Sequence, residues 1–199
     1  MGFFGSEART RRRAEEWLRA RCKRARIVHD LRACFGALLL DVAAIKSGGI
    51  VGVIFARPGE EMGLLKARVS MAKDVAEEVW VIGRLELTQV LAQELPIYVG
   101  VLSDEPSSDP LQFSGRKNFI DPRALARLLT IPELQVLVSS KEVDHLTLAR
   151  CAVEAMTGAE LKAQVCEKLR VRRFDFADEP IAYLTPAREA PTQELQHWP

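Results

Sequence analysis

The acidic residues between positions 41 and 61 offer the most direct chemistry in this chain. Asp41 interrupts the apolar run "LLLDVAAI" (38–45), and Glu60 and Glu61 follow the apolar run "IVGVIFA" (50–56). A carboxylate in an apolar strand is costly unless it is paired, so Asp41 is either held by a structural partner or retained as a functional ligand. Glu60 and Glu61 also have two interpretations. They could supply functional carboxylates near Asp41, or they could simply be acids in the first turn of a helix, where they interact favourably with the helix dipole.

Basic residues gather towards the N-terminus. Residues 1–35 hold ten Lys or Arg against four acids, a net charge of +6 that leaves −5 for the remainder, since the whole chain carries +1. A basic segment on an acidic body is typical of proteins that contact phosphate, although a well-solvated surface helix has the same composition. The candidate nucleic-acid-binding residues are Arg9, Arg11, Arg12, Arg13, Arg19, Arg21, Lys23, Arg24 and Arg57.

The cysteines and histidines do not indicate a zinc site or a disulfide framework. The four cysteines are spread along the chain without a Cys-x-x-Cys pair, and only three histidines complement them. We therefore expect buried, reduced thiols. The cysteines are Cys22, Cys34, Cys151 and Cys166.

The composition is that of a globular protein, with 48% hydrophobic and 28% charged residues. A chain of 199 residues is long enough for one main domain and an appendage. The longest apolar run is interrupted by Asp41 and is too short to span a bilayer, and the first residues lack the pattern of a secretory signal. We expect a cytoplasmic protein without membrane association, and the sequence leaves its oligomeric state open.

The hydrophobic pattern predicts an α/β core followed by helices. Ser6 is expected to cap a helix that runs to about Lys23, and the next three extended segments are expected to form an antiparallel meander. The predicted strands are 26–32, 37–45, 50–56, 78–83 and 97–103, with helices at 60–75 and 87–95 between the later ones.

The second half of the chain has a different pattern. Asp121 and Pro122 open the first of four predicted short helices, as a cap and a first helical residue. We divide the chain into a core with its basic N-terminal helix (1–103), a turn-rich surface loop (104–120), a helical appendage (121–173) and a flexible tail (174–199).

Residues 26–83 resemble the core of the restriction-endonuclease-like superfamily, the PD-(D/E)XK nucleases. The closest similarity is to a branch of small bacterial and phage nuclease-like proteins. The stretch "RKNFIDPRALARLLTIPELQVLV" (116–138) resembles the helical segment that follows the core in those proteins, so that the resemblance covers about residues 10–172. It implies a mixed sheet flanked by helices, with a C-terminal helical appendage.

The signature of that superfamily is an Asp followed by Glu-x-Lys on the third strand. Residues i and i+2 of a strand face the same side, so Asp and Glu can bind Mg²⁺ while the Lys assists the attacking water. The resemblance places the Asp on Asp41, the Glu on Ile54 and the Lys on Ala56. A Gln and a Tyr that often lie on the next helix fall on Arg68 and Ala72.

The resemblance therefore implies a degenerate active site, because four of these five positions lack the residue that the family uses. Ile54 cannot bind a cation, and Ala56 cannot donate a hydrogen bond. Our first hypothesis is a pseudo-nuclease that needs no cofactor and serves as a DNA-binding or DNA-processing accessory factor. Its basic N-terminal helix would bind DNA with salt-sensitive, largely sequence-independent affinity.

Two alternatives remain at this stage. One is an active Mg²⁺-dependent endonuclease with a relocated site, in which Asp41 is the remaining metal ligand and the substitutes are Glu60, Glu61 and Lys66. The other is a protein-binding inhibitor or decoy in a conflict between phage and host. Its partner would meet the apolar former cleft at residues 54–56 or the terminal "HWP".

Overall fold

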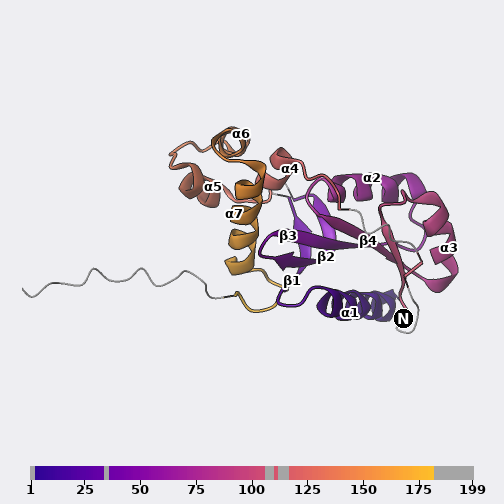
Figure 1. The fold of residues 1–199 in the computed structure, drawn as a ribbon. Coiled ribbons are helices and arrows are strands. Elements are labelled where there is room, and N and C mark those ends of the chain that lie inside the picture. Colours follow the sequence, from indigo (N-terminus) through magenta and orange to yellow (C-terminus); the bar gives the residue numbers. More distant parts are fainter. Residues whose placement is uncertain (1–2, 34–35, 106–109, 112–116, 182–199) are drawn as a thin grey trace, which may run out of the picture.

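A five-stranded mixed sheet with helices on both faces forms the centre of the protein (Figure 1). The computed structural model describes residues 3–33, 36–105, 110–111 and 117–181. The first three strands pair antiparallel, and the last three pair parallel, which confirms the predicted α/β class and the meander. The strands lie in chain order: β1 (Arg26–Arg32), β2 (Leu38–Lys46), β3 (Gly49–Phe55), β4 (Glu78–Gly83) and β5 (Gly100–Ser103).

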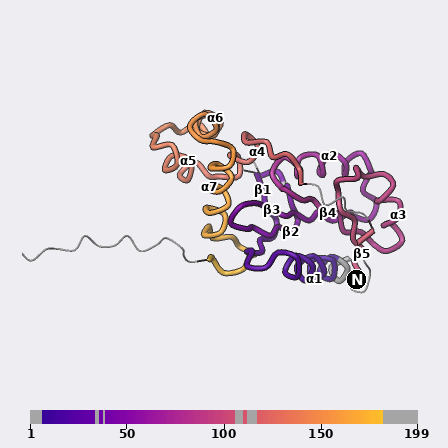
Figure 2. Tube along the Cα trace, in the orientation of Figure 1, coloured from indigo at the N-terminus to yellow at the C-terminus, as the bar shows by residue number. Residues whose placement is uncertain are grey.

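Seven helices of the described chain surround this sheet. They are α1 (Phe3–Arg21), α2 (Met62–Lys73), α3 (Leu85–Glu94), α4 (Pro122–Ala126), α5 (Ile131–Val138), α6 (His145–Ala155) and α7 (Gly158–Val171). Figure 2 shows α1 on one side of the strands and α2 and α7 on the other, with α5 and α6 further out. Because α1 already begins at Phe3, Ser6 lies inside this helix and does not cap it, contrary to the prediction.

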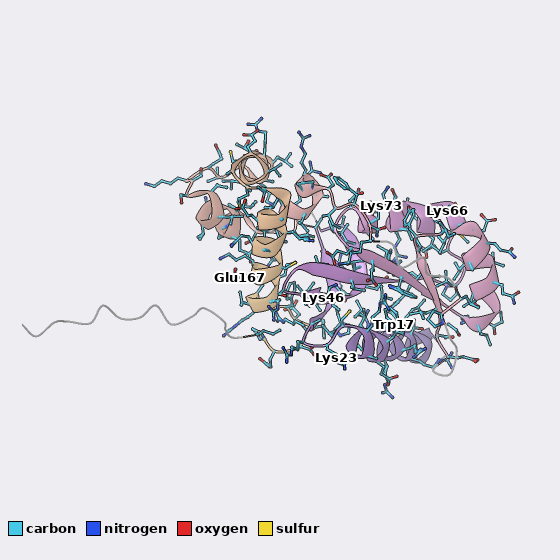
Figure 3. All side chains as sticks on the ribbon, in the orientation of Figure 1. Trp17, Lys23, Lys46, Lys66, Lys73 and Glu167 are labelled. Carbon is cyan, nitrogen blue, oxygen red and sulfur yellow. The ribbon has the colours of Figure 1, made fainter. Side chains whose placement is uncertain are left out.

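Both faces of the sheet are covered at β3, which explains why the sequence of this strand is a continuous apolar run. Every residue of β3 is buried, as expected of a central strand with helices on both sides. Its residues alternate between two apolar clusters: Phe55 faces α1, and Ile54 faces the helices on the other side. On the α1 side, Trp17 points towards the sheet (Figure 3), and its ring centroid lies 4.2 Å from that of Trp80.

The C-terminal helices share the core of the sheet. Leu125 of α4 and Val165 of α7 belong to the same buried cluster as Ile54, so the helical segment is packed onto the core as one body. Local capping explains where these helices begin. The Asp121 carboxylate accepts a hydrogen bond from the N–H of Arg123, as the sequence predicts, and α5 and α7 each begin with a Thr and Glu capping box.

The segment after α7 lies against the edge strand β1. Ala177 forms a bridge with Val28, and the neighbouring backbone hydrogen bonds join His29 to Phe176 and Asp178 to Ile27. Pairing the edge strand satisfies backbone groups that would otherwise be exposed. Residues 176–178, within the segment expected to be a flexible tail from Phe174, therefore lie against the sheet. Residues 182–199 with the terminal "HWP" lie outside the described residues.

The predicted loop 104–120 is only partly described, because residues 106–109 and 112–116 lie outside the described ranges. The described part returns to the sheet, since the N–H of Leu111 donates to the carbonyl of Val101 and that of Asn118 to Glu77. None of the helices in the described part of the chain combines the length and the apolar composition that a bilayer crossing requires.

Candidate functional site

Asp41 lies on β2 with its side chain turned towards α2, and only 3% of that side chain is exposed. Its Oδ2 accepts a hydrogen bond from the backbone N–H of Phe55 at 2.8 Å and another from Nη2 of Arg68 at 2.7 Å. Its Oδ1 lies 3.4 Å from Nη2 of Arg57. Both oxygens of the buried carboxylate thus have partners, and these interactions offset the free energy lost when the carboxylate is removed from water.

Arg68 joins Asp41 to Glu60. Its Nη1 donates to Glu60 Oε1 at 2.9 Å and to the carbonyl of Phe55 at 3.1 Å, while Nη2 holds Asp41. The side chains of Arg68 and Glu60 are 11% and 6% exposed. One guanidinium therefore lies between two buried carboxylates, where the low local dielectric strengthens charge-assisted hydrogen bonds.

The apolar signature positions lie beside this group. Continuing the register of β2 and β3 by one residue beyond the Val42–Val53 pair places Asp41 opposite Ile54. Ile54 and Ala72 are fully buried, and Ala56 packs against the same cluster. Because Ile54 and Phe55 are buried in the core, the idea that residues 54–56 form an open apolar cleft for a protein partner is wrong.

Of the proposed substitute residues, the structure brings only Glu60 to Asp41, through Arg68. Glu61 is exposed at the start of α2, where it forms no side-chain cap. Lys66 points to α3, and its Nζ lies 2.8 Å from Glu94 Oε2. A relocated set of catalytic groups around Asp41 is therefore not assembled by these three residues.

The residues around Asp41 do not fit Mg²⁺. Burial raises the pKa of the Asp41 carboxyl, and the Phe55 N–H together with the guanidinium groups of Arg68 and Arg57 opposes that rise. Mg²⁺ requires oxygen ligands in octahedral geometry, whereas both carboxylates here already accept hydrogen bonds from Arg68 and Ile54 offers no side-chain oxygen. Within the described residues, no three His, Cys, Asp or Glu side chains gather closely enough to hold a metal ion.

Several predicted nucleic-acid-binding arginines of α1 bind carboxylates of the same chain. The pairs, with their N–O distances, are Arg9–Asp104 (3.0 Å), Arg11–Glu7 (3.3 Å), Arg11–Asp30 (3.3 Å), Arg19–Asp178 (2.6 Å) and Arg21–Glu78 (2.9 Å). Arg11–Glu7 lies within α1, whereas the other four pairs join α1 to the rest of the protein, and all five offset positive charge that would otherwise face phosphate. The rest of the predicted set is more open: Arg12, Lys23 and Arg24 are exposed, Arg13 is half-buried, and the Arg57 side chain is 57% exposed.

A second group of charges, which the sequence analysis missed, surrounds Glu77. This carboxylate is buried, and its oxygens lie 2.9 Å from Nζ of Lys162 and 3.2 Å from Nζ of both Lys46 and Lys117. Burial alone would raise the pKa of Glu77, but the hydrogen bonds from the three lysines outweigh it and hold the pKa below 4.5. The lysines lie 31 to 85 residues away from Glu77 in sequence, so no local motif reveals the cluster.

The thiols of Cys22 and Cys166 are structural. Cys22 and Cys166 are buried, and burial raises the pKa of Cys166 to about 11, which leaves little reactive thiolate near neutral pH. Cys151 is partly buried, and Cys34 lies outside the described residues.

Comparison of the chain with family models, with curated proteins and with solved structures gave no match.

Proposed function

We propose that this protein is a catalytically degenerate PD-(D/E)XK nuclease-like protein that binds nucleic acid without cleaving it. The proposal rests on the guanidinium of Arg68, which lies between Asp41 and Glu60 and next to the apolar positions Ile54 and Ala56. Guanidinium is a permanent cation. It therefore supplies from within the chain the positive charge that these carboxylates would otherwise take from a metal ion.

The order of the elements supports the same proposal. A helix, three antiparallel strands, a second helix and a parallel fourth strand follow one another, and Asp41 and Ile54 face the same side of the sheet. Because one fold can host many functions, this order supports descent from a PD-(D/E)XK nuclease but does not indicate the activity. The activity has to be inferred from the residues of the site. The site has a buried ion pair where hydrolysis would need a metal-bound water.

Nucleic-acid binding would depend on cations that remain exposed after α1 has docked. Arg12, Lys23 and Arg24 are exposed on or just after α1, and Arg57 is more than half exposed at the end of β3. Each such contact with a phosphate releases counterions, so the affinity should fall steeply with salt and depend little on sequence.

Fluorescence anisotropy with labelled duplex and single-stranded oligonucleotides tests this proposal. We expect binding at low salt that weakens as salt is raised, and weaker duplex binding by an Arg12→Ala, Arg24→Ala double variant. Arg19→Ala is the matched control, because Arg19 is already paired with Asp178. Absence of binding to either oligonucleotide at low salt would overturn the proposal.

A further inference from the structure

We propose that the surface around Phe119 binds single-stranded nucleic acid, with an unpaired base stacked on the Phe119 ring and a phosphate held by Lys117 and Lys162. This inference rests on the proposed function and deepens it, since it assigns nucleic-acid binding to a surface outside the basic helix α1. The starting observation is that the Phe119 side chain is 89% exposed. A large aromatic side chain in this position is a ready stacking platform.

Phe119 borders two hollows. The larger, with a volume of about 570 Å³, is bordered by Lys73, Ile97 and Tyr98, and the smaller, of about 360 Å³, by Glu77 and Lys162. Lys117, Asn118 and Phe119 border both. An aromatic ring that borders two hollows can hold a base in one and leave the other for the phosphate next to it.

The smaller hollow carries the positive charge that a phosphate needs. Lys117, Lys162 and Glu77 border this hollow and give its lining a net charge of +1. Lys46 also contacts the Glu77 carboxylate, although it does not border the hollow, and it brings the net charge of the whole group to +2. An ammonium group has three donors, and each of these lysines gives one hydrogen bond to Glu77. The remaining donors of Lys117 and Lys162, which border the hollow, are available to phosphate oxygens. Figure 3 shows Lys46 between the sheet and α7.

The larger hollow suits a base. Ile97 is 74% exposed there, and together with Tyr98 it gives the hollow an apolar wall beside the Phe119 ring. Its lining has no net charge, because it includes two lysines and two aspartates: Lys73, Lys117, Asp74 and Asp121. Stacking on one exposed ring requires a base that is not paired within a duplex, which points to a single strand.

This surface is independent of the Asp41 site. Glu77 directly precedes the first residue of β4, whereas Arg68 contacts Phe55, the last residue of β3. Because β3 and β4 are parallel, the two groups lie at opposite ends of the sheet. Substitutions at Phe119 should therefore leave the Arg68 ion pairs unchanged.

The test is an anisotropy titration of fluorescein-labelled dT12 with the full chain at several salt concentrations. Phe119→Ala should weaken binding roughly ten-fold, the size of a lost base stack. Lys117→Gln and Lys162→Gln should each reduce the slope of log affinity against log salt by about 0.7, the value for one phosphate on a single strand. The matched controls are Phe176→Ala and Lys141→Gln, which remove an exposed ring and an exposed lysine elsewhere and should have no effect.

Each contrary result has a separate meaning. If the wild type binds dT12 and Phe119→Ala behaves like Phe176→Ala, the assignment to this surface is overturned while the proposed function stands. If dTMP displaces dT12 at equal concentration, the site is one for free nucleotides and the assignment to single strands is wrong. If the wild type binds neither dT12 nor a duplex at low salt, this inference and the proposed function fail together.

Discussion

Arg68 on α2 donates a 2.7 Å hydrogen bond to Asp41 on β2, although the two residues are 27 positions apart in the chain. The same guanidinium holds Glu60, which lies near the end of the loop that leads into α2. Two carboxylates thus share one internal cation near the end of β3, and Arg57 adds a second positive charge beside Asp41. The fold keeps its acidic residues there by pairing them within the chain.

Arg68→Met should lower the free energy of unfolding by about 3 kcal/mol at neutral pH, because it leaves two buried carboxylates without their cation. Burial already raises the pKa of the Asp41 carboxyl, and loss of the Arg68 guanidinium, which opposes that rise, would raise it further. The stability lost by the variant should therefore be smallest in acid and should grow as the pH rises through the folded-state pKa of Asp41. Urea unfolding at several pH values measures this, with the more exposed Arg57→Met as control. Equal stability of Arg68→Met and wild type at neutral pH would contradict the account.

Arg26→Lys should destabilise the protein by about 2 kcal/mol, even though it keeps the charge. The Arg26 side chain is buried and donates to four backbone carbonyls, those of Leu169, Arg170, Arg172 and Asp178. A single ammonium cannot reach all of them. Thermal unfolding followed by circular dichroism tests the prediction against the exposed Arg32→Lys, and similar melting temperatures for the two variants would show that these contacts contribute little.

Glu77→Gln should destabilise the protein at neutral pH by about 2 kcal/mol, and the difference from wild type should disappear in acid. The pKa of Glu77 is held below 4.5 in the folded state, so its contribution is present above the unfolded value and is lost as the pH falls through the folded value. Chemical unfolding between about pH 3 and 7 measures the effect. Glu167→Gln is the control on the exposed side of α7 (Figure 3), and it should leave the free energy of unfolding unchanged at neutral pH.

The sheet could be predicted because its signal is local. The run "IVGVIFA" has no polar face, and β3 is indeed buried along its whole length. Capping signals were equally local, as the pair of Asp121 and Pro122 shows at the start of α4. The prediction that Ser6 caps the first helix was wrong, because a residue that suits a cap is also tolerated inside a helix. The helix α1 begins at Phe3, three residues before Ser6.

The site could be predicted only in part, because ion pairs depend on tertiary contacts. The count of basic residues near the N-terminus does not reveal that Arg19 pairs with Asp178, 159 residues away. Similarly, the position of Arg68 on a predicted helix gives neither the rotation of that helix nor the reach of the side chain to Asp41. The sequence identified Asp41 and Glu60 as candidates, and the structure added the guanidinium between them.

Cleavage of supercoiled plasmid by the wild-type protein, with Mg²⁺ and with Mn²⁺, tests the central claim most directly. Asp41→Asn is the control, because it removes the charge of the carboxylate but keeps an oxygen that can accept the hydrogen bond from Phe55. We expect no metal-dependent nicking or linearisation by either protein. Cleavage that the wild type performs and Asp41→Asn does not would contradict this expectation, and would show that Asp41 still serves a metal-dependent nuclease.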